Sequence, residues 1–143
     1  MPRVALVTGG TRGIGAAIAG ILKEAGHQVV VTYQGNEDAA AAFTRSTGMP
    51  AHRWDVGDFA ACQDGVSRIE QQYGSVDILV NNAGITRDGM LHKMTSEDWD
   101  SVIRTNLTSA FNMTHAVING MRERGFGRLI QISSVNGVKG QMG

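Results

Sequence analysis

Residues 4–15 read VALVTGGTRGIG, an apolar run that passes directly into a glycine-rich turn. The apolar residues Val4–Val7 suit a strand that is covered on both faces, as in a parallel sheet. After the turn, Ile14, Ile18, Ile21 and Leu22 recur at the spacing of a helix. The stretch therefore predicts a strand, a tight turn and a helix in direct succession, which is the opening unit of an α/β fold.

The rest of the chain repeats this alternation of short apolar runs and longer helical patterns. Four further strands are expected at residues 28–32, 51–54, 76–80 and 128–133. Helices are expected over residues 14–25, 38–47, 59–73 and from 96 to about 124. With right-handed crossovers, this order predicts an α/β fold with a doubly wound parallel sheet, Rossmann-like and truncated after the fifth strand.

Two of these helices have a clear start and a regular apolar pattern. Asp58 is expected to cap the third helix, and Thr95 with Asp98 resembles a capping box at the start of the fourth. The third helix carries Cys62, which we interpret as a small buried side chain, together with Phe59, Val66, Ile69 and Tyr73. The apolar residues of the fourth are Trp99, Val102, Ile103, Leu107, Phe111 and Val117.

Composition and charge narrow the classes of function. The 143 residues suit one domain, and 13 Lys and Arg balance 13 Asp and Glu, which argues against nucleic-acid binding. The N-terminal apolar run is too short for a signal peptide, and no run approaches the length of a membrane span. The histidines lack metal-ligand spacing, and one cysteine cannot form an internal disulfide. We expect a reduced, cytoplasmic protein without a metal, membrane or nucleic-acid partner.

The glycine-rich turn TGGTRGIG comes after the first strand, and in doubly wound sheets ligands bind at the carboxyl ends of the strands. The turn matches neither G-x-G-x-x-G nor a P-loop, but its glycines let the backbone N–H groups of a helix start approach a pyrophosphate. We interpret it as a dinucleotide site; a tight turn with packing glycines is the alternative. Many NAD-binding sheets have an acidic residue after the second strand that holds the ribose 2′-hydroxyl, but Tyr33 and Gln34 at this place are neutral. Arg12 projects from the glycine-rich turn and can reach a 2′-phosphate. The alternative for Arg12 is a solvated loop charge.

Polar residues also follow the other strands. Asp55, after the third strand, either contacts an adenine amino group or caps a turn. NNAG, residues 81–84, follows the fourth strand and suits contact with a flat ligand. Asn106 lies inside the expected fourth helix, where asparagine is mildly unfavourable. The ordinary explanation for an asparagine there is that its side chain is exposed to solvent. The fifth strand delivers Ser133 and Ser134 to its carboxyl end.

Together these motifs resemble the short-chain dehydrogenases/reductases over the whole chain. The resemblance rests on TGGTRGIG, the pair Asp55 and Val56, NNAG, Asn106 and the ISS of residues 132–134. The longer stretches NNAGITRDGMLHKMT, NLTSAFNMTHAVINGMRERGFGR and ISSVNGVKGQMG are similar to NADPH-dependent acetoacetyl-CoA reductases of polyhydroxybutyrate synthesis. The 3-oxoacyl-carrier-protein reductases of fatty acid synthesis are the second choice.

The resemblance implies a role for each matching residue. NADPH would be held by Thr8, Gly9, Thr11, Arg12, Gly13, Ile14, Gly15, Asp55, Val56, Asn82, Ala83, Gly84 and Ile85. Ser134 would hydrogen-bond the substrate carbonyl, and Asn106 would hold a water of the proton relay. Asp88 and Gln141 would lie near the acyl-thioester substrate, while Ser133 would be structural.

The resemblance also implies a general acid that these residues lack. The family uses a tyrosine four residues before a lysine, and neither Tyr33 nor Tyr73 has a lysine at that position. We expect this pair just beyond Gly143, so that residues 1–143 are the N-terminal part of a single dinucleotide-binding catalytic domain. The fragment alone is then inactive, and the parent enzyme is a homotetramer. A non-catalytic nucleotide-binding module is the alternative of another class.

Overall fold

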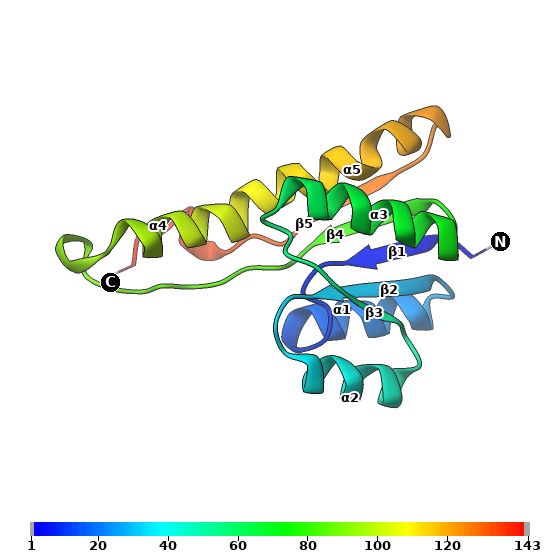
Figure 1. Ribbon diagram of the computed structural model, residues 1–143, viewed down its shortest axis with the longest axis horizontal. Helices are drawn as coiled ribbons and strands as arrows, with labels where there is room; N and C mark the ends of the chain where they lie inside the picture. Colours follow the sequence, from blue (N-terminus) through cyan, green and yellow to red (C-terminus); the bar gives the residue numbers. More distant parts are fainter. Residues whose placement is uncertain (1, 142–143) are drawn as a thin grey trace.

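The computed structural model describes residues 2–141, which form one parallel sheet with helices on both faces (Figure 1). The strands are β1 (Val4–Val7), β2 (Gln28–Tyr33), β3 (Ala51–Arg53), β4 (Val76–Asn81) and β5 (Arg128–Gln131). They lie in the order β3-β2-β1-β4-β5, and every neighbouring pair is parallel. The doubly wound sheet expected from the sequence is confirmed.

The helices divide into two layers around this sheet. They are α1 (Gly13–Glu24), α2 (Glu37–Thr47), α3 (Phe59–Tyr73), α4 (Ser96–Ile103) and α5 (Ser109–Glu123). In the view of Figure 1, α1 and α2 lie below the sheet, and α3 and α5 lie above it. Each layer has its own core, because side chains alternate between the two faces of a strand. Leu6 and Leu79 belong to the core under α3 and α5, and Val7 and Val80 to the other.

Several boundaries differ from the expected ones by one or two residues. β2 extends to Tyr33, β3 stops at Arg53, and β5 stops at Gln131 although Ile132 still donates a backbone hydrogen bond to Asn81. α2 begins at Glu37 because the side chain of Asn36 caps it. The caps expected for α3 and α4 are confirmed, since Asp58 and Thr95 each accept a first-turn N–H.

The long helix expected over residues 96–124 is interrupted. A π-helical turn, η2 (Arg104–Thr108), joins α4 to α5. The side facing the sheet carries Thr105, Ser109, Asn112, Met113, Val117 and Met121. The side bearing most of the expected apolar residues remains exposed, namely Trp99, Ile103, Leu107 and Phe111. The apolar spacing therefore located the helix, but of the apolar residues named for it Val117 is buried and these four are exposed.

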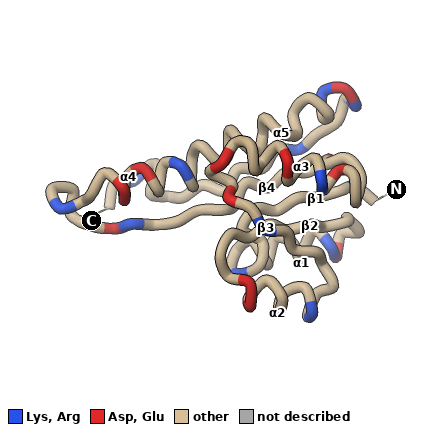
Figure 2. Tube along the Cα trace, in the orientation of Figure 1, with Lys and Arg blue, Asp and Glu red and all other residues tan. Residues whose placement is uncertain are grey.

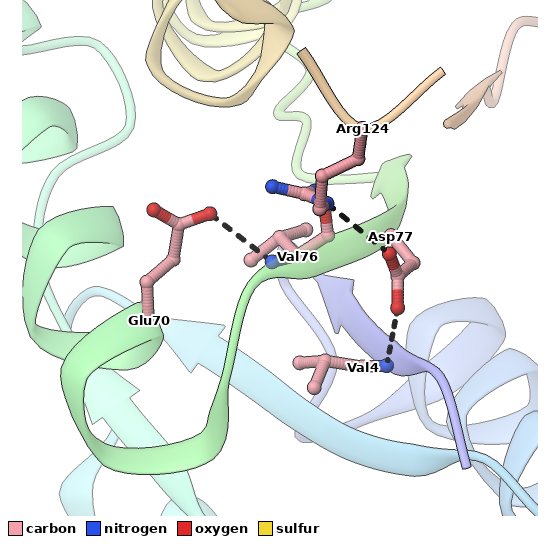
Figure 3. A network of polar contacts seen from close by, with 5 residues as sticks. All are labelled: Val4, Glu70, Val76, Asp77 and Arg124. Carbon is pink, nitrogen blue, oxygen red and sulfur yellow. Dashed lines mark hydrogen bonds and ion pairs between the residues drawn. The ribbon is translucent and has the colours of Figure 1, made fainter. Parts of the chain in front are cut away.

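The amino ends of β1 and β4 are fastened by a polar network (Figure 3). The register between the strands shifts so that Asp77 has no partner on β1, and its carboxylate accepts the N–H of Val4 at 3.3 Å. Arg124, just after α5, lies 3.7 Å from that carboxylate and donates to the carbonyl of Val76 at 2.8 Å. Glu70 of α3 accepts the N–H of Val76 at 3.1 Å. Both upper helices are thus tied to the sheet at the amino ends of its central strands.

Cys62 is fully buried on the sheet-facing side of α3, and its predicted burial is confirmed. Its thiol is 3.3 Å from the carbonyl oxygen of Val56. Burial, the largest cause, raises the pKa of this thiol to about 11, and Asp55 and Asp58 act in the same direction. The thiol therefore stays protonated at neutral pH and behaves as a small core side chain.

Lysines and arginines alternate with acidic residues along the helices and loops, and neither sign dominates the trace (Figure 2). Within residues 2–141, no helix is both long enough and apolar enough to cross a bilayer.

Candidate functional site

The start of α1 differs from those of α2, α3 and α4. Asn36, Asp58 and Thr95 cap α2, α3 and α4 with their side chains. At α1 the capping position is Arg12, and among the described residues no side chain accepts its first-turn N–H groups and no acidic residue lies in that turn. The first N–H groups of a helix need partners and carry partial positive charge. The α1 start is therefore ready to bind an anion.

The glycine-rich turn lies against the residues that follow β4. Gly9 adopts a left-handed φ of +61°, which favours glycine. A side chain at Gly15 would collide with the carbonyl oxygen of Gly9 and with the amide nitrogen of Asn82. That amide donates to the carbonyl oxygens of Thr8 and Gly9 at 3.0 and 3.2 Å. The glycines keep the α1 start open, and Asn82 holds the turn in this shape.

Thr8 is buried, and its hydroxyl is fully engaged. It accepts the N–H groups of Asn82 and Ala83 at 3.0 and 2.9 Å and donates to the carbonyl of Val80 at 3.4 Å. Thr8 thus joins the carboxyl ends of β1 and β4. Its backbone is engaged as well, because the N–H donates to the carbonyl of Val80 at 3.0 Å and the carbonyl accepts the side-chain amide of Asn82. The contact expected between Thr8 and a pyrophosphate stays a prediction.

Two cavities meet at this end of the sheet and contain most of the expected cofactor residues. The larger, of about 830 Å³, is lined by Arg12, Ile14, residues 81–87, Asn106 and residues 131–134 among others. The second, of about 420 Å³, is lined by Gly9, Arg12, Gly13, Ile14, Gly15, Gln34, Val56, residues 82–85 and Thr105. Thr8, Thr11 and Asp55 line neither cavity.

Asp55 caps a turn, one of the two alternatives that the sequence left open. Its Oδ1 accepts the N–H of Gly57 at 2.8 Å. Val56 lines the second cavity, and its carbonyl accepts the side-chain amide of Asn112 at 3.0 Å. Asn112 is 2% exposed and fixes the wall on which Val56 lies. The contact between Asp55 and adenine stays a prediction.

Asn106 lies within the π-helical turn and pairs with the backbone of Ile85. Its side-chain oxygen accepts the N–H of Ile85 at 2.8 Å, and its nitrogen donates to the carbonyl of Ile85 at 2.9 Å. The amide thus joins the segment after β4 to η2, as a strand neighbour would. Since both ends of the amide are occupied, its expected role in holding a water stays a prediction.

A third cavity, of about 410 Å³, brings the remaining site residues together. Asp88, Gln141, Asn106 and Ser134 line it with apolar Trp99, Met94 and Val102. Ser134 is exposed, also lines the largest cavity, and accepts the N–H of Asn136 at 3.2 Å. Ser133 lines only the largest of these cavities. The expected substrate residues and Ser134 thus share one space beside the cofactor residues.

Comparison with known proteins assigns the family. Residues 3–143 match the model of the short chain dehydrogenases.

The chain belongs to the short chain dehydrogenase family.

The curated relatives carry more specific names. The acetoacetyl-CoA reductases of Rhizobium meliloti (strain 1021) and Shinella zoogloeoides are 62% and 58% identical over 143 residues, which is 100% of this chain and 59% of each relative. The 3-oxoacyl-[acyl-carrier-protein] reductase of Escherichia coli (strain K12) is 42% identical over 143 residues, 99% of this chain and 58% of the relative. The chain therefore spans somewhat less than three-fifths of the length of these relatives.

The residues of this short chain dehydrogenase fit a nicotinamide dinucleotide. The uncapped α1 start suits a pyrophosphate, and a side chain at Gly15 would fill the space beside it. Arg12 supplies a cation where the first and second cavities meet. Within residues 2–141, no group of three or more His, Cys, Asp or Glu side chains is arranged to hold a metal ion.

Sequence reasoning missed two residues of this short chain dehydrogenase site. Asn112 supports Val56 from 56 residues away, and no local pattern marks such a partner. Thr105 is buried in η2 and lines the second cavity. The only sequence signal for Thr105 was that it is a polar residue directly before Asn106 in the same helix.

Proposed function

We propose that this chain is the N-terminal part of an NADPH-dependent reductase of 3-oxoacyl thioesters. Its reaction is the reduction of acetoacetyl-CoA to 3-hydroxybutyryl-CoA, as needed for polyhydroxybutyrate synthesis. The names and identities of the Rhizobium meliloti and Shinella zoogloeoides relatives support this substrate. The main structural support for this function is that Ser134, Asp88 and Gln141 all line the third cavity.

The residues around the first and second cavities would hold the cofactor. The start of α1 would bind the pyrophosphate, and Arg12 the 2′-phosphate, because both offer positive charge to an anion. Val56 would border the adenine, and residues 82–85 would line the ribose and nicotinamide. Bound there, a reduced nicotinamide supplies the hydride that the 3-keto carbon needs.

Ser134 and Asn106 would prepare the reacting centre. The hydroxyl of Ser134 donates a hydrogen bond to the substrate carbonyl oxygen, where negative charge grows during the reaction. Asn106 keeps the wall at Ile85 fixed through its two hydrogen bonds. Neither residue supplies a proton at neutral pH, and Tyr33 and Tyr73 lack a lysine four positions later. Residues 1–143 alone are therefore expected to be inactive.

Two alternatives remain behind this proposal. Reduction of 3-oxoacyl-carrier-protein is supported by relatives of lower identity, at 41% and 42%. A non-catalytic nucleotide-binding module is favoured only for residues 1–143 by themselves, because they lack the tyrosine–lysine pair. Ser134 beside the substrate residues argues against it for the parent enzyme, since nucleotide binding alone needs no such hydroxyl.

We also propose that the parent enzyme is a homotetramer. The exposed residues Trp99, Ile103, Leu107 and Phe111 recur every four positions along α4, η2 and α5. Phe59 stacks on Phe111 with ring centroids 6.1 Å apart and widens this apolar stripe. Contiguous exposed apolar surface of this kind is typical of an association face.

The test uses a completed chain, in which residues 1–143 are joined to the C-terminal part of the Rhizobium meliloti relative. We expect it to oxidise NADPH with acetoacetyl-CoA, and residues 1–143 alone to show no turnover. Ser134→Ala in the completed chain should lower kcat on the order of a hundredfold, as loss of one oxyanion donor does. Ser133→Ala, the matched control, should lower it much less.

Two results would contradict the proposal. Turnover by residues 1–143 near the rate of the completed chain would mean that they contain an acid other than the expected tyrosine. A completed chain with higher kcat/KM for 3-oxoacyl-carrier-protein than for acetoacetyl-CoA would assign the protein to the second reductase class.

A further inference from the structure

The outer wall of the second cavity is held by an arginine that does not line it. Gln34, just after β2, lines the cavity together with residues of the glycine-rich turn, and its side of the cavity is called the outer wall. Its backbone carbonyl accepts a hydrogen bond from Nε of Arg53 at 2.8 Å. Arg53 is the last residue of β3 and is in register with Tyr33. One guanidinium therefore lies a single residue away from the cavity wall.

The same guanidinium pairs with an acid at the start of α2. Nη1 of Arg53 contacts Oε1 of Glu37, the first residue of that helix. Arg12 is the only charged residue that lines the second cavity within the described part of the chain. The charge balance of the outer wall therefore depends on whether Glu37 is neutralised by Arg53.

The pair contributes little to folding stability. The Arg53 and Glu37 side chains are 56% and 66% exposed, and exposed ion pairs are weak in water. The two charges nevertheless act on a ligand anion bound nearby, because that anion interacts electrostatically with Arg53 and with Glu37 whether or not their ion pair stabilises the fold. A phosphate monoester carries about −1.5 to −2 charges at neutral pH. An unpaired Glu37 would repel such a group, and Arg53 removes that repulsion.

We propose that Arg53 is a positioning residue that makes this wall selective for a 2′-phosphorylated dinucleotide. It acts through Gln34, whose carbonyl it holds, and through Glu37, whose charge it neutralises. Arg12, which lines the same cavity, contacts the phosphate directly. This inference rests on the proposed NADPH-dependent function and adds Arg53 and Glu37 to its specificity.

The test measures binding of adenosine 2′,5′-bisphosphate and of 5′-AMP to residues 1–143 by calorimetric titration. The two ligands differ only by the 2′-phosphate, so the ratio of their Kd values reports selectivity alone. Arg53→Ala should weaken the bisphosphate about fivefold and leave 5′-AMP nearly unchanged. Glu37→Gln should strengthen the bisphosphate, and Arg53→Ala combined with Glu37→Gln should restore much of the loss.

Two controls separate charge from structure. Arg45→Ala removes an exposed arginine from the far end of α2 and should not alter the Kd ratio. Arg53→Lys keeps the charge and should retain most of the selectivity. In the completed chain, the ratio of kcat/KM for NADPH to that for NADH should fall with Arg53→Ala by the same factor as the Kd ratio.

The outcomes distinguish this inference from the proposed function. A wild-type chain that binds both ligands equally would overturn the NADPH assignment and the inference with it. A wild-type chain that prefers the bisphosphate, with Arg53→Ala weakening both ligands equally, would overturn only the inference and make Arg53 structural. Loss of selectivity in Arg53→Ala that Glu37→Gln does not relieve would overturn the part assigned to Glu37.

Discussion

β1 and β5 are strands of four residues that both pair with β4, yet they lie in opposite surroundings. No residue of β1 is more than 5% exposed, whereas every residue of β5 is exposed and Ile130 reaches 42%. β1 has β2 on its other side, and within residues 2–141 no strand lies beyond β5. An apolar run therefore identifies a strand but not how well it is covered.

The difference is one of neighbours. Val4–Val7 is closed in by strands on both sides and by helices on both faces. β5 offers apolar side chains together with unpaired backbone groups along its free edge, a combination that favours association. β3, at the opposite edge, has only three residues, and its last residue carries a charge. Edges of that kind resist pairing with another chain.

The largest expected effect separates the centre of the sheet from its edge. Leu6→Ala should lower the free energy of unfolding by about 2–5 kcal/mol, because Leu6 is fully buried and its neighbours cannot fill the cavity. Leu129→Ala should cost less than about 1 kcal/mol, since Leu129 is 38% exposed. Urea unfolding of both variants measures the two values. Equal losses would contradict the contrast between β1 and β5.

An intermediate effect tests the core beside β1 through Cys62. Burial raises the pKa of this thiol to about 11, above its ordinary value of 9.0. Between these two pH values the unfolded chain loses the thiol proton and the folded chain keeps it, so stability falls as pH rises. The loss should total roughly 2–3 kcal/mol, as each tenfold change in proton affinity is worth about 1.4 kcal/mol.

The measurement is urea unfolding from about pH 9 to about pH 11. Cys62→Ala is the control, because lysines and tyrosines also titrate in this range and only the difference between the two proteins belongs to the thiol. Parallel pH profiles would mean that the thiol is accessible to water in the folded state.

The smallest expected effect concerns the free edge. Ile130→Lys should weaken self-association of residues 1–143 about tenfold, or about 1.4 kcal/mol, because a charge on an edge strand opposes pairing. Sedimentation equilibrium gives the association constants. Ala42→Lys adds the same charge to an exposed position on α2 and should not change them. Association that persists unchanged in Ile130→Lys would assign it to another surface, such as the apolar stripe around Leu107.

Most of the fold could be predicted from short stretches of sequence. Apolar runs and glycine turns located all five strands, and Asp58 and Thr95 marked two helix starts because a cap is made within one turn. At the site, the resemblance in TGGTRGIG and NNAG selected residues that lie around the same two cavities. These features depend on residues close together in sequence, which a pattern can record.

Long-range pairs account for what the sequence did not predict. The π-helical turn coincides with the pairing of Asn106 and Ile85, which are 21 residues apart. The buried side of α5 includes Asn112 because Val56 lies opposite it. Phe111 belongs to the same apolar pattern as Val117, yet it is 60% exposed while Val117 is buried. Nothing in a single helix distinguishes an apolar side that packs on its own sheet from one that stays at the surface.

The bare start of α1 has a consequence for the evolution of this protein. Asp, Ser or Thr in place of Arg12 would cap the helix and add about 1 kcal/mol of stability, and a few mutations suffice to reach them. The same substitutions would place an acceptor where an anionic ligand needs donors. Under the cofactor role proposed for this turn, selection for heat resistance alone should therefore erode ligand binding.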